Sequence, residues 1–317
     1  MTVEQLPLFA GDLAPGGSVP PATGRDRLTP DSLLGAAMER FREHLIQHDY
    51  AENTVKSFLG DLRIFKRYLK GDPRIGQLSH QDLQRYLYWL QHERGTPCSP
   101  KSYARRLTSL KVFFAWLAEV GVLTSDPAAS LVHKPVSTPL PQILYDQQVD
   151  QVLAVTREMM AAEKPDPRPH LLVTLVLHTG IKKQECMGIK LAHIDTSNPT
   201  EPVVHIRYSN PRMHHKERRL RLPAEWTHTL AHYRRVYEPQ DILFPCTARN
   251  LEYVLADAAK QAGLPEGLSF EALRWTCAVR DYRAPLDADR RRRKLGLSMM
   301  SWRESEPKII RLAEPPL

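Results

Sequence analysis

Clusters of arginine and lysine are the residues of this sequence best suited to chemistry, because their side chains donate hydrogen bonds to phosphate oxygens. Two clusters are short runs, at residues 214–218 and 290–294. A third is spaced around one predicted helix and comprises Lys101, Arg105, Arg106 and Lys111. An ordinary solvated face is the alternative for each cluster. For the helix cluster we favour contacts with the phosphates of a nucleic acid, and for the run 290–294 we favour contact with phosphate or with another subunit.

The charge balance points the same way. The 317 residues include 44 Lys and Arg against 36 Asp and Glu, a net charge of +8 that favours a polyanionic partner. An apolar share of 42% with 25% charged residues is typical of a globular protein with room for two domains. No apolar run is long enough to span a membrane and no signal pattern begins the chain, so we expect a cytoplasmic, nucleoid-associated protein.

Cysteines and histidines give no sign of a metal site. The four cysteines, Cys98, Cys186, Cys246 and Cys277, are scattered without a C-x-x-C pair. The neighbours His214 and His215 have no carboxylate or thiol at ligand spacing. We therefore predict no metal, no other cofactor and no disulfide framework.

The first half of the chain predicts a helical bundle behind a flexible tail. Residues 1–30 are rich in Gly, Pro, Ser and Thr and cannot bury enough apolar surface to order. From Asp31 on, apolar residues recur at three-to-four spacing. They predict four amphipathic helices, at 31–50, from 53, from 79 and at 99–118, which form a bundle domain over residues 31–131.

The second half predicts a mixed domain over residues 143–317, joined to the bundle by a proline-rich linker at 132–142. Helices are expected at 146–160 and 170–178. Alternating apolar residues at 203–208 and 219–222 predict two strands that pair as a hairpin. The predicted fold class is mainly α with a small β-sheet.

The stretch from Leu268 to Pro307 resembles the last part of the catalytic domain of tyrosine recombinases of the phage-integrase and Xer type. The family frame reads S-P-H-x-L-R-H-T, then L-G-H-S, then a nucleophilic tyrosine. SFEALRWT and KLGLS occupy this frame without a gap. Arg274 matches the family arginine, whereas Glu271 and Leu297 replace the two histidines and Glu306 replaces the tyrosine.

Three further blocks extend the resemblance from Leu33 to Glu306. AENTVKSFLGDLRIFKRYL and ARRLTSLKVFFAWL are similar to the family's core-binding, SAM-like domain. TGIKKQE resembles T-G-[LM]-R-x-S-E, so Glu185 is kept and Lys182 replaces the first catalytic arginine. HHKER resembles G-K-G-x-K-x-R, which puts Lys216 on or near the catalytic lysine.

The resemblance implies how DNA is held. A four-helix core-binding domain and an α+β catalytic-type domain would form a C-shaped clamp around the duplex. The DNA-contacting residues that it implies are Thr54, Lys56, Ser57, Lys101, Ser102, Arg105, Arg106, Lys111, Lys182, Lys216, Arg218 and Arg274.

The substitutions weaken the chemistry that the resemblance implies, in which tyrosine attacks a phosphodiester clamped by two arginines. Lys182 loses the bidentate geometry of a guanidinium. Glu271 places an anion where a donor should meet the transition state, and Leu297 donates nothing. Losing one such donor typically costs roughly 10²–10³ in rate. Glu306 would form a hydrolysable acyl phosphate, so we predict no strand cleavage by this chain alone.

Three functions remain open. We favour a non-catalytic DNA-binding protein that is an accessory or regulatory factor in recombination or integration of a mobile element. The alternatives are an active recombinase subunit that completes its site with a partner recombinase, and a scaffold for protein contacts only. A docking peptide for the replication sliding clamp, Gln5, Leu6, Leu8 and Phe9, is a further possibility; a chance apolar patch is the favoured interpretation of it.

Overall fold

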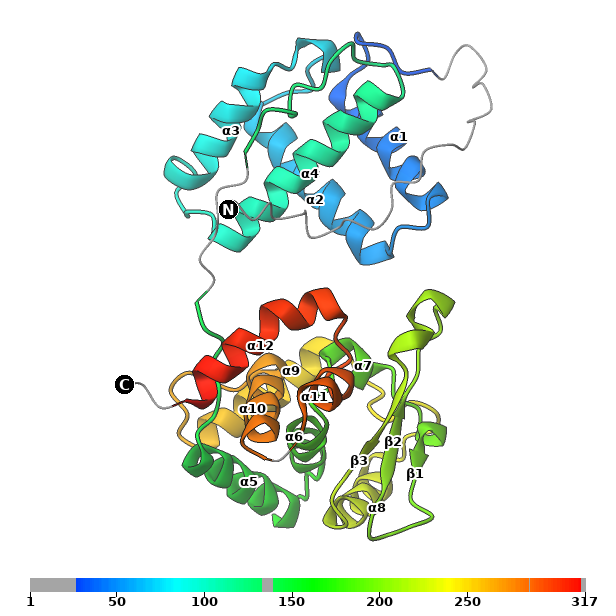
Figure 1. Cartoon of the computed structure of the whole chain (residues 1–317), viewed down its shortest axis with the longest axis vertical. Helices are drawn as coiled ribbons and strands as arrows, with labels where there is room; N and C mark the ends of the chain where they lie inside the picture. The colour runs from blue at the N-terminus through cyan, green and yellow to red at the C-terminus, as the bar shows by residue number, and fades with distance from the viewer. Residues whose placement is uncertain (1–26, 133–138, 285, 315–317) are drawn as a thin grey trace. The chain divides into compact units, whose positions relative to one another are not determined.

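The chain divides into two compact units, Met1–Thr138 and Pro139–Leu317. The computed structural model describes residues 27–132, 139–284 and 286–314 (Figure 1). The predicted clamp peptide at Gln5–Phe9 and most of the predicted linker, residues 133–138, lie outside the described residues. The C-shaped clamp therefore stays a prediction, and each unit is described by itself.

The first unit is a bundle of four helices. They are α1 (Leu34–Gln47), α2 (Glu52–Tyr68), α3 (His80–His92) and α4 (Pro100–Glu119), with a short 3-10 turn, η1 (Ile75–Gln77). Ser79 caps α3 in a capping box with Asp82, and Ser99 caps α4 ahead of Pro100 at the first helical position. Phenylalanines from three helices fill the core, including Phe41, Phe58, Phe65, Phe113 and Phe114.

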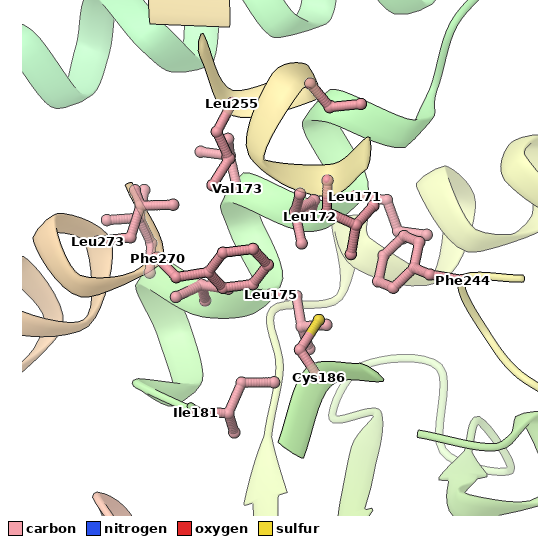
Figure 2. Close-up of a cluster of buried hydrophobic side chains, with 14 of the residues drawn as sticks. Leu171, Leu172, Val173, Leu175, Ile181, Cys186, Phe244, Leu255, Phe270 and Leu273 are labelled. Carbon is pink, nitrogen blue, oxygen red and sulfur yellow. The ribbon is translucent and has the colours of Figure 1, made fainter. Parts of the chain in front are cut away.

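Helix α6 (Arg168–Thr179) is the centre of the second unit. Its residues 171–177 are all buried, because the helix is apolar on every side. It packs against α5 (Asp146–Ala161), α8 (Glu225–Tyr237), α9 (Ala248–Gln261) and α10 (Phe270–Arg283). Figure 2 shows its leucines meeting Phe244, Leu255, Phe270 and Leu273. The smaller helices are α7 (Lys183–Met187) and α11 (Ala288–Lys294).

A three-stranded antiparallel sheet of order β1-β2-β3 covers one side of this core. It consists of β1 (Ile194–Asp195), β2 (Val203–Ile206) and β3 (Arg218–Arg221). Val204 pairs with Leu220, and both side chains are buried. The predicted hairpin is confirmed, while β1 is too short to show a pattern in the sequence. The β2–β3 connection contains a 3-10 helix, η3 (Pro211–Lys216).

The last helix, α12 (Met299–Ala313), packs on α10 of its own chain. Trp302 and Ile309 are buried there against Ala278 and Val279. The two helices lie side by side in Figure 1, α12 in red. The predicted fold class, mainly α with a small sheet, is confirmed. None of the described helices is long and apolar enough to cross a membrane.

Candidate functional site

A cavity of about 680 Å³ in the second unit brings together four of the six predicted catalytic positions, Lys182, Glu271, Arg274 and Leu297. The other two positions, Lys216 and Glu306, are not among its lining residues. Much of its wall is apolar, contributed by Ile181, Leu268, Phe270, Trp275, Ala278, Leu295, Leu297 and Ile309. The remaining lining residues are Lys183, Glu252, Ser269 and Ser305. We call this cavity the α10 pocket.

Arg274 joins two turns beneath the pocket. Its guanidinium donates one hydrogen bond to the carbonyl of Gly180 and another, of 2.6 Å, to the carbonyl of Leu295. Gly180 ends α6 with φ of 59°, and a β-carbon there would lie 2.7 Å from Leu295 Cδ2. Only glycine therefore lets the end of α6 approach this closely. Burial lowers the pKa of Arg274.

Lys182 lies just before α7, and its ammonium donates a 3.2 Å hydrogen bond to the carbonyl of Gly296. Burial lowers the pKa of this lysine. The positive charges of Arg274, Lys216 and Arg218 lower it further, while the charge of Glu185 opposes them. The side chain is thus a partly desolvated cation among other cations.

Glu185 is a buried carboxylate that holds this region together. It accepts hydrogen bonds from both Nη atoms of Arg218, from the Tyr208 hydroxyl and from the backbone N–H of Lys182. Burial by itself would raise its pKa, but the hydrogen bonds and charge of Arg218 outweigh burial and lower it. The sequence resemblance retains Glu185, but nothing in the sequence links it to Tyr208.

Arg218 is committed to contacts inside the protein. Its side chain is only 9% exposed, and Nε donates a 2.7 Å hydrogen bond to the carbonyl of Lys294. Three successive backbone carbonyls, of residues 294, 295 and 296, thus accept hydrogen bonds from Arg218, Arg274 and Lys182, respectively. We call residues 294–296 the capped turn. The sequence predicts that Arg218 is exposed and contacts a DNA phosphate. In the structure, Arg218 is instead paired with the buried carboxylate of Glu185.

The two remaining catalytic positions lie apart from the pocket wall. Lys216 ends η3, half-buried, with Nζ 3.8 Å from Met213 Sδ. Glu306 is on α12, with its carboxylate 4.0 Å from Nη2 of Arg291. Arg291 in turn stacks over the ring of Tyr282, 4.8 Å from its centroid. Tyr282 belongs to α10.

Glu271 remains an exposed carboxylate in the first turn of α10. It accepts a 3.3 Å hydrogen bond from the indole N–H of Trp275, one helical turn later. A carboxylate is favourable at a helix N-terminus, so the residue is locally stable there. Its position in the pocket wall nevertheless places negative charge beside Arg274.

The basic run 290–294 is neutralised within the chain. Arg290 pairs with Asp287 at 3.2 Å, and Lys294 pairs with Asp281 at 2.8 Å. Arg292 and Arg293 share Asp289, and Arg291 faces Glu306. The solvated and structural interpretation of this run is therefore favoured over a phosphate site.

In the bundle, the four cations of the α4 cluster occupy unequal positions. Lys101 is exposed, and Arg105 is 40% exposed with a 2.9 Å ion pair to the buried Asp61. Arg106 is buried and donates to Cys98 Sγ. Lys111 donates to the carbonyl of Leu131 at 2.9 Å. Among the four, Lys101 and Arg105 are the cations most open to a ligand.

The other predicted contacts of the bundle lie at the starts of α2 and α4. Lys56 is 68% exposed and pairs with Glu52 at 2.5 Å. Thr54 and Ser57 are half-buried on the same helix. Ser102 accepts a 3.0 Å hydrogen bond from the capping Ser99. Their contact with DNA stays a prediction.

A four-helix bundle is followed along the chain by a helical unit with a small antiparallel sheet, an arrangement also found in solved structures of integrases and recombinases. Residues 38–121 match the family model described as phage integrase, N-terminal SAM-like domain. The comparisons with known proteins support the tyrosine recombinase family for this chain.

Curated relatives of the chain are tyrosine recombinases. It is 34% identical to the tyrosine recombinase XerC of Mycobacterium leprae over 166 residues, 51% of this chain and 54% of that protein. The chain thus spans about half the length of the mycobacterial relatives that it matches. Similarity to XerC of Lacticaseibacillus casei is 27% over 256 residues, 75% of this chain and 82% of the relative.

Solved structures show the same fold at low identity. A lambda integrase dimer bound to a COC′ core site matches with a TM-score of 0.67 and 15% identity, over 90% of this chain and 80% of the other. XerH bound to a palindromic difH substrate, a post-cleavage complex, matches with a TM-score of 0.67 and 16% identity. This match covers 89% of this chain and 82% of the XerH chain.

Proposed function

We propose that this chain binds duplex DNA as a recombinase-derived accessory or regulatory factor in recombination or integration, and that it does not carry out recombinase strand cleavage alone. The observation that carries this proposal is the content of the α10 pocket. Lys182 and Arg274 are retained as cations there, while Leu297 and Glu271 stand at the two histidine positions. Glu306 stands at the tyrosine position and faces Arg291.

The cations of the α10 pocket can attract a phosphate group, but the pocket lacks the donors that cleavage of a phosphodiester bond requires. Cleavage builds extra negative charge on phosphorus, so donors must be aimed at that charge. The carboxylate of Glu271 repels this negative charge, and the side chain of Leu297 has no hydrogen-bond donor to offer it. The guanidinium of Arg274 already donates to two backbone carbonyls. These features support binding without strand cleavage.

Family membership and surface charge support the DNA ligand. Solved structures of the same fold are described as bound to DNA, including lambda integrase and XerH. Lys101 and Arg105 offer exposed charge on the bundle. Cations that neutralise phosphates release counterions, so affinity should fall steeply with salt. A fluorescence anisotropy titration of duplex at two salt concentrations tests this, and no binding at low salt would contradict the proposal.

The second part of the proposal concerns cleavage. Nicked suicide substrates trap the covalent intermediate of an active tyrosine recombinase, and this chain alone should yield no DNA-linked species. A covalent adduct of the unmodified protein with such a substrate, whose bases are all intact, mapped by mass spectrometry to any side chain, would overturn this part of the proposal. Such an adduct would instead favour the alternative that the chain is an active recombinase subunit.

A recombinase subunit that completes its site with a partner is the second candidate. The retained cluster of Lys182, Lys216 and Arg274 favours it, since a partner would only need to supply the nucleophile and proton donors. Adding an intact recombinase encoded beside this chain would then produce cleavage at a site that the partner alone leaves uncut. Unchanged cleavage would remove this candidate.

The sliding clamp is a further proposed partner, through the peptide Gln5–Phe9. Deleting these five residues should abolish co-purification with the clamp and leave DNA affinity unchanged. If the full-length chain shows no interaction with the clamp, the peptide is a chance apolar patch.

A further inference from the structure

The ammonium of Lys182 lines the α10 pocket without a carboxylate partner. Within the described residues, Nζ has one hydrogen-bond acceptor, the carbonyl of Gly296 at 3.2 Å, and no carboxylate at ion-pair distance. The nearest candidate, Glu185, uses its two oxygens for Arg218, for Tyr208 and for the backbone N–H of Lys182. The amine of Lys182 therefore has no direct carboxylate partner, and only the charge of Glu185 acts in favour of its protonated form.

Two features of the surroundings favour the neutral amine. The wall around it is largely apolar, with Ile181, Leu268 and Leu295 among its members. The cations Arg274, Lys216 and Arg218 repel a positive charge, and together with burial they lower the pKa of Lys182. Desolvation and neighbouring cations are the two conditions that activate lysine as a nucleophile toward carbonyl carbon.

We propose that Lys182 is a nucleophilic amine that forms an imine with an aldehyde carrying a neighbouring phosphate, and that the aldehyde is an abasic deoxyribose in duplex DNA. This inference rests on the proposed DNA-binding function. The arginine found at this position in the family stays protonated and forms no imine. The change to lysine therefore makes imine formation with an aldehyde possible at this position.

The pocket offers complementary groups for such a sugar. Arg274 provides positive charge for a flanking phosphate. Phe270, Trp275 and Leu297 provide apolar surface where the sugar has lost its base. The exposed carboxylate of Glu271 lines the same cavity and can accept a proton from carbon.

The steps balance without an oxidant or a metal. The nitrogen lone pair of Lys182 attacks C1′ of the ring-opened sugar; a proton from solvent is taken up by the hydroxyl that forms there, and its loss as water leaves a protonated imine. Glu271 then removes a proton from C2′, and that electron pair forms the C2′–C3′ double bond. The C3′–O bond breaks and the 3′ phosphate leaves with its electrons. Water hydrolyses the imine and releases the amine of Lys182.

Borohydride trapping tests the amine directly. A labelled duplex with one abasic site is incubated with the full chain and sodium borohydride, and the covalent product is digested and mapped by mass spectrometry. We expect the label on Lys182 and a loss of at least about tenfold in Lys182→Arg, which keeps the charge but not the nucleophile. Lys190→Arg, at an exposed lysine outside the pocket, is the matched control and should trap like the wild type.

The position of the label decides the proposal. Equal trapping by wild type and Lys182→Arg, or labels spread over surface lysines and the α-amino group, would overturn it. Trapping with free 2-deoxyribose 5-phosphate but not with abasic duplex would overturn the DNA source of the aldehyde. Anisotropy of the wild type on intact duplex separates the two proposals: absent binding would contradict the DNA function, whereas binding without trapping at Lys182 would contradict only the imine.

Discussion

Arg218 donates two hydrogen bonds to the carboxylate of Glu185, from Nη2 to Oε2 at 2.8 Å and from Nη1 to Oε1 at 3.1 Å. Their side chains are 9% and 2% exposed, so the pair is a buried, bidentate ion pair. It ties the start of β3 to α7, and Nε of Arg218 ties both to the capped turn. The position of Lys182 and Arg274 around that turn depends on this pair.

Removing the charge of Glu185 should destabilise the second unit. Glu185→Gln leaves the buried guanidinium of Arg218 without its counter-charge, which costs about 3–5 kcal/mol. Urea denaturation followed by circular dichroism measures the change. Glu252→Gln is the matched control, because the Lys183–Glu252 pair is exposed and should contribute only about 0–1 kcal/mol. Equal losses in the two variants would contradict the structural role of Glu185.

The same pair predicts an acid dependence of stability. The pKa of Glu185 is lower in the folded chain than its ordinary value of 4.5. Its contribution is therefore complete above pH 4.5 and is lost as the pH falls toward the folded pKa. The wild-type free energy of unfolding should fall more steeply than that of Glu185→Gln in this range. Parallel curves would rule out a contribution from this carboxylate.

The capped turn requires glycine at position 296. Its φ is 59°, and a β-carbon would lie 2.7 Å from Nη1 of Arg218. Gly296→Ala should thus cost the backbone strain of about 1–2 kcal/mol and a further loss from displacing Arg218. Gly263→Ala is the control, since Gly263 has φ of 66° but no atom within 4 Å of a β-carbon. Thermal unfolding should show the larger loss in Gly296→Ala; equal losses would show that the Arg218 contact contributes nothing.

Exposed charge on α4 should govern salt-dependent DNA binding. Replacing Lys101 and Arg105 with alanine should weaken binding to every duplex and lower the slope of log affinity against log salt by about 2. Arg63 and Arg67 are exposed on α2 and outside the predicted contacts, so their double alanine variant is the control. If the control loses as much affinity as the α4 variant, the expected surface is wrong.

Restoring cleavage should need several changes at once. Glu306→Tyr alone should give no covalent product, since Glu271 and Leu297 would still stand where the transition state needs donors. The combined variant Lys182→Arg, Glu271→His, Leu297→His and Glu306→Tyr should give partial cleavage of suicide substrates, because groups that act as a unit are strongly non-additive. Cleavage by the single variant would show that the pocket is competent already.

The sequence determined the elements that its own periodicity controls. The four bundle helices follow from apolar residues at three-to-four spacing, and the start of α4 follows from local chemistry at Ser99 and Pro100. Lys182, Glu271, Arg274 and Leu297 could be selected from the residues alone through a motif frame, and they do line one cavity. Spacing along the sequence was sufficient to select these four residues, because each motif lies within a single helix or turn.

Only the tertiary structure decided which charges face inward. Arg105 and Arg106 are neighbours in the sequence, yet one is 40% exposed and the other is buried against Asp61 and Cys98. Arg218 looks like a surface cation until Glu185, 33 residues away, is placed against it. A charge is buried when a partner from another element offsets its desolvation, and the sequence does not state where that partner lies.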